Sequence, residues 1–342
     1  MRKLAAVVLS LAVVATVGAF GKPHPSWELT PTGVTARFRG LAPVSAKVAW
    51  AAGSAGTILR TVDGGRTWAS VGPPGVEELQ FRDIEAFDAW NAVALTIGEG
   101  TDSRIYRTSD GGRSWIEAFR NDEPAAFYDC VTFLDRRRGL ALSDPVGGKF
   151  RILATADGGR TWTVRDDARM PAALPGEFAF AASGTCLVSA GGRAFFATGG
   201  GERSRVFSSL DFGRGWTVSD SPVPSGPAAG IFSLAFRDPW HGIAVGGDFN
   251  PGTAAPDGSA TTRNGGRTWT VSRKVPGEYR SGATFRFGGV ALAVGPTGSD
   301  WSIDGGRTWK RFDTGSFDAV LCARDGSCWA SGEKGRIARL RG

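Results

Sequence analysis

The side chains that could carry chemistry in this chain are few, and their spacing excludes the commonest catalytic sites. The 342 residues include two histidines, His24 and His241. A hydrolytic triad needs an imidazole beside a nucleophile, and no Gly-x-Ser-x-Gly phrase occurs. A zinc site needs several His or Cys ligands at short spacing, and no Cys-x-x-Cys occurs either. We therefore expect no metal centre and no triad, and we interpret His241 as a turn histidine bonded to nearby backbone.

The best remaining candidate for catalysis is the run Glu278-Tyr279-Arg280, which places a carboxylate, a phenol and a guanidinium side by side. A phenol and a carboxylate are groups that some glycosidases use as nucleophile and acid. Redox cofactors are not indicated, because no Gly-x-Gly-x-x-Gly phrase precedes a helix. We expect no cofactor, and a glycosidase is the enzymatic alternative that stays open.

One phrase, Thr/Ser-x-Asp-Gly-Gly-Arg-Thr/Ser-Trp, dominates the sequence in four clean copies and two degenerate ones. With Trp27, its tryptophans recur every 40 to 54 residues, which indicates one supersecondary unit copied many times. The acid or amide and the tryptophan of successive copies are Asp63 and Trp68, Asp110 and Trp115, Asp157 and Trp162, Asp211 and Trp216, Asn264 and Trp269, and Asp304 and Trp309.

Each unit predicts four short strands. In the second unit these are 81–87, 92–97, 104–108 and 115–119, rich in β-branched and aromatic residues and separated by Gly, Asn and Asp. The repeated phrase falls in the hairpin between the third and fourth strands, where Asp can accept backbone N–H groups and Gly allows positive φ. We expect its Trp to pack against its own sheet. Four-stranded antiparallel sheets that must stack radially form a β-propeller.

The two ends of the sequence predict how the ring closes. After Trp309 the chain supplies strands at 317–322, 327–330 and 336–340, with no further copy of the phrase. The segment 26–30 near the N-terminus is a lone fourth strand that contains Trp27. Joining them gives an all-β, seven-bladed propeller in a single domain, residues 26–342.

The N-terminus predicts export. Arg2 and Lys3 precede an apolar run from Leu4 to Phe20, and 17–19 resembles a cleavage site. We predict a signal peptide over 1–19 and a linker over 20–25, which makes the protein periplasmic, lumenal or secreted. An uncleaved membrane anchor is the alternative.

The four cysteines fit an exported protein. Cys322 and Cys328 flank a five-residue loop between two expected strands, so we predict a disulfide there. Cys130 and Cys186 fall near the innermost strands of adjacent blades, where they are either a second disulfide or two buried thiols.

The formal charge of +7 is spread rather than concentrated. Six arginines belong to the repeated phrase and must lie around the rim, whereas a nucleic-acid footprint lies on one face. We therefore expect no nucleic-acid partner; the basicity favours an acidic protein or a membrane. We expect a monomer.

The repeated phrase resembles the Asp-box (BNR) repeat of sialidases, other glycan hydrolases, sortilin-like receptors and photosystem II stability/assembly-factor propellers. The Asp-Gly-Gly-Arg-Thr-Trp form, the seven-fold count and the phrases at 230–236 and 295–298 are similar to the photosystem II assembly-factor family and its bacterial relatives, over about residues 25–342. This resemblance implies a lumenal or periplasmic scaffold, tied to photosynthesis in some organisms. It would bind a protein client, such as a membrane protein or complex, without catalysis.

The rival within this repeat class is a sialidase-like enzyme. Such an enzyme needs an arginine cluster for the substrate carboxylate, a Tyr/Glu nucleophile and an acid. The Phe-Arg-Ile-Pro phrase of sialidases is missing here, and Phe38-Arg39-Gly40-Leu41 is a poor substitute for it. Fold evidence from the repeats does not decide function.

We expect ligands to bind on one face of the ring. In a propeller, the loops from second to third strands and those between blades share the face around the channel, and long loops on a rigid scaffold commonly bind ligands. The predicted binding residues on this face are Asp144, Glu177, Asp248, Asn250, Glu278, Tyr279, Arg280 and Asp300.

Overall fold

The structure is a computed structural model, and it describes residues 24–250 and 254–342. The predicted signal peptide, 1–19, and most of the predicted linker lie outside the described residues. Within them, no helix is both long and apolar enough to cross a membrane.

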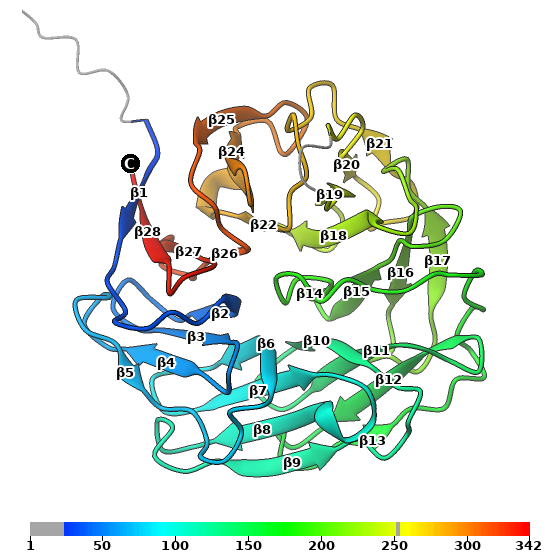
Figure 1. Cartoon of the computed structure of the whole chain (residues 1–342). Coiled ribbons are helices and arrows are strands. Elements are labelled where there is room, and N and C mark those ends of the chain that lie inside the picture. Colours follow the sequence, from blue (N-terminus) through cyan, green and yellow to red (C-terminus); the bar gives the residue numbers. More distant parts are fainter. Residues whose placement is uncertain (1–23, 251–253) are drawn as a thin grey trace, which may run out of the picture.

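The described chain forms seven four-stranded antiparallel sheets arranged radially around an axis (Figure 1). Six of the sheets, or blades, use four strands that follow one another in the chain. The seventh takes one strand from the N-terminus. The structure confirms the predicted seven-bladed propeller.

The first four blades are built from consecutive strands. Blade 1 consists of β2 (Phe38–Pro43), β3 (Ala49–Gly53), β4 (Ile58–Thr61) and β5 (Ala69–Ser70). Blade 2 consists of β6 (Gln80–Ala86), β7 (Ala92–Ile97), β8 (Arg104–Thr108) and β9 (Ile116–Arg120), with the short 3-10 helix η1 (Gly100–Asp102). Blade 3 consists of β10 (Tyr128–Phe133), β11 (Gly139–Val146), β12 (Lys149–Thr155) and β13 (Thr163–Val164). Blade 4 consists of β14 (Leu187–Ala190), β15 (Arg193–Ala197), β16 (Arg205–Ser209) and β17 (Thr217–Asp220).

The last three blades lead back to the N-terminus. Blade 5 consists of β18 (Ala229–Phe236), β19 (Gly242–Asp248), β20 (Ser259–Thr262) and β21 (Thr270–Val271). Blade 6 consists of β22 (Gly282–Phe285), β23 (Ala291–Gly295), β24 (Gly298–Ser302) and β25 (Lys310–Asp313), with η2 (Phe287–Gly289). Blade 7 consists of β26 (Ala319–Cys322), β27 (Cys328–Ser331), β28 (Ile337–Arg341) and β1 (Ser26–Leu29).

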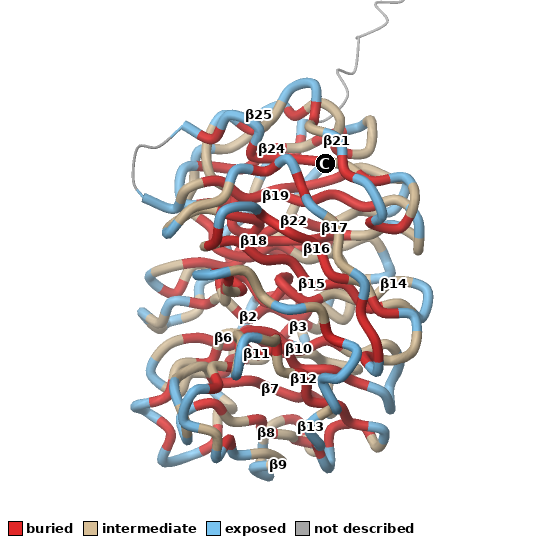
Figure 2. Tube along the Cα trace, turned by 90° about the vertical axis from the view of Figure 1, so that its right-hand side faces the viewer, coloured by how far each residue is buried: buried red, intermediate tan, exposed pale blue. Residues whose placement is uncertain are grey.

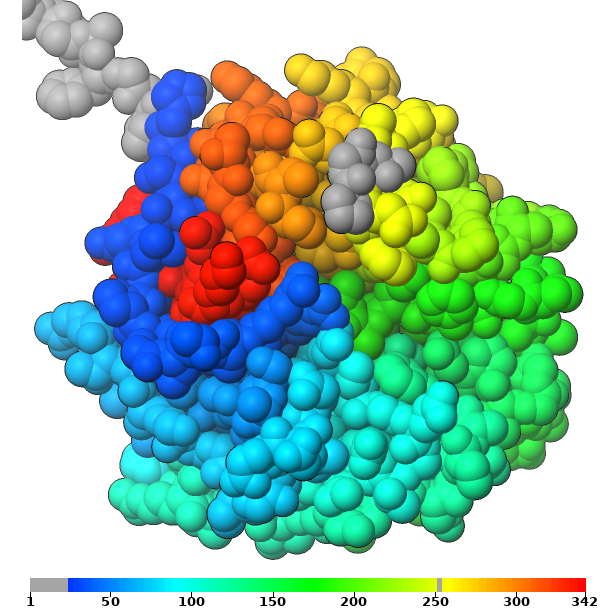
Figure 3. All heavy atoms as spheres, viewed as in Figure 1, coloured from blue at the N-terminus to red at the C-terminus, as the bar shows by residue number. Residues whose placement is uncertain are grey.

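The ring closes as the sequence predicted. β1 pairs antiparallel with β28, and Trp27 lies opposite Leu340. Figure 3 shows the first described residues, in blue, beside the last ones, in red, in blade 7. Because β1 pairs along the outer edge of β28, it completes the four-stranded sheet of blade 7 and ties the two ends of the propeller together.

The turn formed by each copy of the repeated phrase, here called the repeat turn, is held by its own polar side chains. In blade 1 the carboxylate of Asp63 accepts the backbone N–H of Thr67 at 3.0 Å and its hydroxyl at 2.7 Å. The Thr61 hydroxyl oxygen accepts the N–H of Gly65 at 2.9 Å. Gly64 and Gly65 both have φ of 81°, a conformation that favours glycine.

The tryptophans of the repeat turns do more than pack on their own blades. The Trp115 indole of blade 2 donates to the Val71 carbonyl of blade 1 at 2.6 Å, and Trp309 of blade 6 donates to the Ser259 hydroxyl of blade 5 at 3.1 Å. Trp27 likewise donates to Ser299 of blade 6 at 2.9 Å. The expectation that each Trp packs against its own sheet is therefore incomplete, because the indoles of Trp115 and Trp309 also reach the preceding blade and link the two.

The apolar core consists of layers between neighbouring blades. One cluster joins Trp50 and Ile58 of blade 1 to Phe81 and Ala94 of blade 2. Figure 2 shows buried residues through the thickness of the ring and exposed residues at its two faces. Burial of this kind is the main favourable contribution to folding, and it fixes each blade against the next.

Blade 4 departs from the others before its first strand. Residues 178–186, here called the channel segment, precede β14 as an irregular stretch. The loop before β14 reaches toward the middle of the ring (Figure 1). There the Arg82 guanidinium of blade 2 donates to the Ala181 carbonyl at 3.0 Å. A disulfide joins the segment to blade 3 through Cys130 and Cys186, and a second joins Cys322 to Cys328.

Candidate functional site

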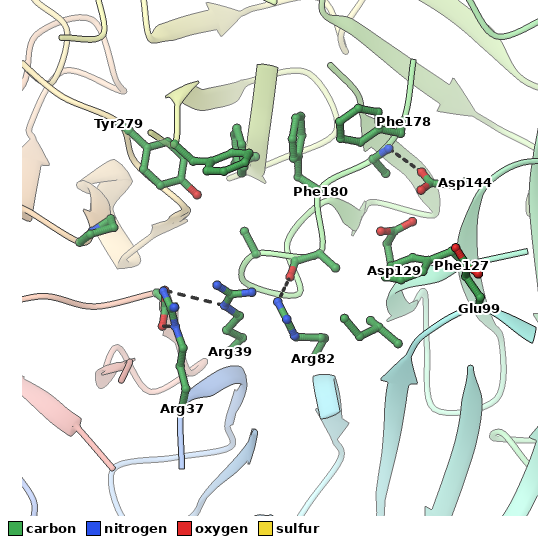
Figure 4. Close-up of a pocket in the computed structure, with 18 of the residues that line it drawn as sticks. Arg37, Arg39, Arg82, Glu99, Phe127, Asp129, Asp144, Phe178, Phe180 and Tyr279 are labelled. Carbon is green, nitrogen blue, oxygen red and sulfur yellow. Dashed lines mark hydrogen bonds and ion pairs between the residues drawn. The ribbon is translucent and has the colours of Figure 1, made fainter. Parts of the chain in front are cut away.

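A cavity of about 850 Å³ opens on the axis, at the end of the ring where the first strands begin and the second strands end. Its residues come from blades 1 to 7, and the channel segment forms part of its wall. Figure 4 shows arginines on one side of this channel-mouth cavity, carboxylates on the other and aromatic rings along a third. This cavity opens on the face that the sequence predicted for binding.

The cationic side is formed by Arg37 and Arg39, at the start of β2, and by Arg82 of β6. Arg37 makes a bidentate pair with Asp318, at 2.8 and 2.6 Å. Arg39 reaches Asp318 only at 3.9 Å, and its Nε has no hydrogen-bond partner among the described residues. Burial lowers the pKa of Arg39. Arg39 is thus a cation on this wall whose buried Nε–H lacks an acceptor among the described residues.

The anionic side is formed by Asp129 of β10 and Asp144 of β11. Asp129 is 1% exposed, and its Oδ2 has no hydrogen-bond partner among the described residues. Burial, together with the neighbouring Asp144 carboxylate, raises the pKa of Asp129. Burial raises the pKa of Asp144 to about 7, opposed by a 2.8 Å hydrogen bond from the Ala179 N–H. Two acids in one enclosure resist ionising together, so this wall holds a proton at neutral pH.

The aromatic wall is continuous. Phe178 contacts Phe180 at 4.8 Å between ring centroids, Phe180 stacks on Phe232 at 3.8 Å, and Phe232 meets Tyr279 edge-on at 4.6 Å. Phe249, directly after β19, extends the series, with its ring centroid 6.1 Å from that of Phe232. Phe249 is 48% exposed, so the apolar wall reaches the surface. Such a wall offers flat, rigid contact area at low conformational cost.

Two of the predicted binding residues, Asp144 and Tyr279, line the cavity. Asp248 ends β19 and accepts the N–H of Asn250 at 2.9 Å, so these two form an exposed turn beside Phe249. The rest of that predicted loop includes 251–253, which lie outside the described residues.

The other predicted binding residues lie in ion pairs away from the cavity lining. Glu177 is buried and pairs with Arg205 at 2.8 Å. Arg280 is fully buried and pairs with Asp300 at 2.7 Å. The third pair is at the surface, between Glu278 and Arg311 at 2.9 Å. The structure therefore does not bring the eight residues together as one cluster.

Sequence reasoning missed the arginines and Asp129. They lie at the channel-facing starts of the innermost strands, whereas the prediction concentrated on the longer loops. A signal was present: Arg37-Phe38-Arg39 alternates polar and apolar residues at a strand start, which places both guanidinium groups on one side of the strand.

The arginines, carboxylates and aromatic rings of the cavity offer contacts for charged and apolar ligand groups. The phenol of Tyr279 is not an activated nucleophile, because burial raises its pKa and so disfavours the ionised form. Arg37 and Arg82 are already committed to Asp318 and to the Ala181 carbonyl. Among the described residues, no group of three or more His, Cys, Asp or Glu side chains is placed to hold a metal ion.

No known family profile matches the sequence, and no curated protein matches it either. Solved structures do match. YCF48 bound to a D1 peptide superposes with a TM-score of 0.65 and 16% identity, covering 92% of this chain and 96% of that one. The chain resembles YCF48 in fold. YCF48 from Cyanidioschyzon merolae gives the same TM-score and identity over 92% of this chain and 98% of that one.

The likeness to YCF48 stands beside a more general one. The WD40 propeller domain of Doa1 matches with a TM-score of 0.59 and 11% identity, over 92% of this chain and 97% of that one. At these identities the shared property is the fold. The predicted resemblance to the photosystem II assembly factors is confirmed at that level.

Proposed function

We propose that this protein is an exported, non-enzymatic propeller that binds a peptide segment of a protein client in the channel-mouth cavity. One observation carries the proposal. Half-buried Arg39 and buried Asp129 line the same cavity from opposite sides (Figure 4), and each has one buried polar atom, Nε and Oδ2, without a hydrogen-bond partner among the described residues. A buried polar group without a partner is costly, so a ligand that satisfies both is favoured.

A peptide has the chemistry that these walls require. An anionic group, from a side chain or a chain terminus, would pair with Arg39, while amide or cationic donors would bond Asp129 and Asp144. Apolar side chains would lie on the rings of Phe180, Phe232 and their neighbours. A volume of about 850 Å³ is in the range of ligand pockets and suits a few residues of extended chain.

The fold comparison supports this choice of ligand. YCF48, which shares the propeller architecture at 16% identity, has been seen with a D1 peptide bound. We extend only the ligand class, a peptide, to the present chain. The client is then a protein with an accessible segment or terminus, and a membrane protein under assembly fits this description.

Export is part of the proposal. Two disulfides in the described chain suit an oxidising compartment, and the apolar run at 4–20 suits a secretion signal or a retained anchor. We propose a periplasmic, lumenal or secreted monomer that presents the cavity to its client.

The test is selection of peptides by the protein itself. A displayed library of random peptides, with a D1 peptide as reference probe, is passed over the wild-type chain and over Arg39→Gln and Asp129→Asn. Wild type should enrich peptides that combine a carboxylate with apolar residues. Arg39→Gln should weaken those peptides by about tenfold or more, because a charge-assisted bond is lost.

Arg214→Gln, a change of the same chemistry on an exposed repeat turn outside the cavity, is the matched control and should bind like wild type. Selection without any enriched pattern, or equal binding by all four proteins, would refute peptide binding at this cavity.

A glycosidase is the second candidate, favoured by the raised pKa values of Asp129 and Asp144, because a protonated and an ionised carboxyl together could act as acid and base. Two observations argue against a glycosidase. Arg37 is already paired with Asp318, and burial raises the pKa of the Tyr279 phenol, which makes it a poor nucleophile. Aryl glycosides and sialosides are the probes: turnover abolished by Asp144→Asn would replace the binding proposal, and none is expected.

A further inference from the structure

The face opposite the cavity, here called the turn face, is built from two sets of turns. One set joins the first and second strands of each blade, and the other set is the repeat turns. The sets pack together: the first glycine of the repeat turn donates its N–H to a carbonyl of the other turn, from Gly64 to Lys47 at 2.9 Å and from Gly111 to Trp90 at 2.9 Å. Gly265 donates to Trp240 in the same way at 2.9 Å.

The turn face is rich in arginine. Across its described turns the sequence places fourteen Lys or Arg side chains against nine Asp, and it places no Glu there. The aspartates of the repeat turns are held inward by N–H and hydroxyl donors, as Asp63 is by Thr67. By contrast Arg137, Arg214 and Arg267 are exposed, and none makes a side-chain hydrogen bond or ion pair with the described residues. These three guanidinium groups are therefore exposed charges of this face that no described carboxylate neutralises.

The same turns also expose large apolar side chains. Six of the ten most exposed ones belong to the turn face, which distinguishes it from the outer edges and the cavity face: Val62, Trp90, Leu210, Trp240, Phe287 and Ile303. Phe287 is 90% exposed at the tip of its turn. Trp240 carries the Arg193 guanidinium over its ring at 4.0 Å, so aromatic and cationic groups interleave.

The described chain also begins at the turn face. His24 lies beside the C-terminal Gly342: a Cβ added at Gly342 would lie 3.1 Å from the His24 carbonyl oxygen. The Gly342 carbonyl accepts a 2.8 Å hydrogen bond from Arg286, in the turn between β22 and β23. The first described residue, His24, therefore lies on the face that carries the arginines and exposed aromatics.

We propose that the turn face docks on an anionic bilayer surface. Arginines spread around a ring match a plane of lipid phosphates, and exposed Trp and Phe side chains insert at the headgroup level. A compact acidic protein would need one concentrated patch, whereas these groups come from turns all round the ring. Docking in this orientation points the channel-mouth cavity away from the bilayer, toward the soluble segments of membrane proteins.

The test is co-sedimentation of the full chain with vesicles of phosphatidylcholine alone or mixed with phosphatidylglycerol. The same full-length protein is tested with both kinds of vesicle. The apolar N-terminal run is present in both measurements, so the difference in binding between the two lipids reports the contribution of the arginines. The triple variant Arg137→Gln, Arg214→Gln, Arg267→Gln should lose about a hundredfold in partitioning to the anionic vesicles, since each basic group near such a surface contributes about one kcal/mol. Phe287→Ser should weaken binding further.

Two matched controls keep the test decisive. Arg120→Gln, Arg203→Gln, Lys334→Gln removes three exposed charges from the opposite end of the strands, and Ile116→Ser removes an exposed apolar group from the outer strand β9. Neither should change vesicle binding. Equal binding to both lipids, or equal loss in the test and control triples, would overturn the proposal. An acidic protein captured by the turn face in place of vesicles would overturn it too, and peptide binding at the cavity is untouched by either result.

Discussion

Cys130 of β10 and Cys186, one residue before β14, are joined by a disulfide that connects blades 3 and 4 across 56 residues, with Cα atoms 6.2 Å apart. Both sulfurs are fully buried. The bond anchors the end of the channel segment, whose other end carries Phe178 and Phe180 into the cavity wall. The disulfide therefore positions part of the proposed binding site.

Removing this disulfide should cost both stability and binding. In Cys130→Ser, Cys186→Ser the unfolded chain regains the freedom of a 56-residue loop, and the free energy of unfolding should fall by about 4 kcal/mol, measured by denaturant titration. The double variant Cys322→Ser, Cys328→Ser opens a loop with a separation of only 6 and should lose about 2 kcal/mol. Equal losses in the two variants would contradict this account.

Gly184 should not tolerate a side chain. Its φ is +74°, and an added Cβ would lie 2.3 Å from the Asp83 Oδ1, which is itself buried. Gly184→Ala should lower the free energy of unfolding by at least about 2 kcal/mol through backbone strain and this collision. Gly192→Ala, also at positive φ but with open space around it, separates the two effects, since it should show the strain alone.

Glu85 should make stability depend on pH near neutrality. Burial raises the pKa of this half-buried carboxyl from 4.5 to about 7, against hydrogen bonds from Thr132 and Phe133. Between these values the folded protein holds a proton that the unfolded chain has lost. The contribution of the Glu85 proton to the free energy of unfolding is therefore greatest below pH 4.5, declines as the pH rises, and is gone above about pH 7.

Thermal melts of Glu85→Gln across this range provide the measurement. The variant should match wild type at the acidic end and become progressively more stable than wild type toward neutral pH. Glu78→Gln, at an exposed position, serves as the control for losing a surface carboxylate. A constant difference between Glu85→Gln and wild type at every pH would show that the carboxyl is not the titrating group.

Trp27 should be important for closing the ring. Its indole donates to Ser299 and packs against Phe312 and Phe317, at 5.9 and 5.4 Å between ring centroids. Trp27→Ala should lower the free energy of unfolding by about 2 to 3 kcal/mol. Leu29→Ala, on the same strand but 57% exposed, should have little effect. Hydrogen exchange of β28 amides should speed up in the first variant only.

Much of the fold could be predicted because its signals are local. The repeated Asp-Gly-Gly turn dictates a hairpin through φ and side-chain hydrogen bonds within eight residues, as Asp63, Thr61 and Gly64 illustrate. The strands of blade 2 were predicted to within one residue at each end. Closure could be inferred by counting strands, because β1 supplies the one that blade 7 lacks.

The candidate site was decided by long-range contacts. Asp144 and Tyr279 were predicted for the cavity face and line the cavity, but Arg280, predicted beside them, turns into the fold and pairs with Asp300. Arg39 and Asp129 meet only because blades 1 and 3 converge on one axis. No local pattern marks residues 178–186 as a segment that enters the channel.

The sequence by itself determined the four-stranded blade and the number of blades, since hairpin geometry and strand alternation depend on neighbouring residues. Tertiary structure alone decided which charges are neutralised in pairs and which are left facing the cavity. The physical reason is that the cost of burying a charge depends on partners more than a hundred residues away, as between Arg37 and Asp318.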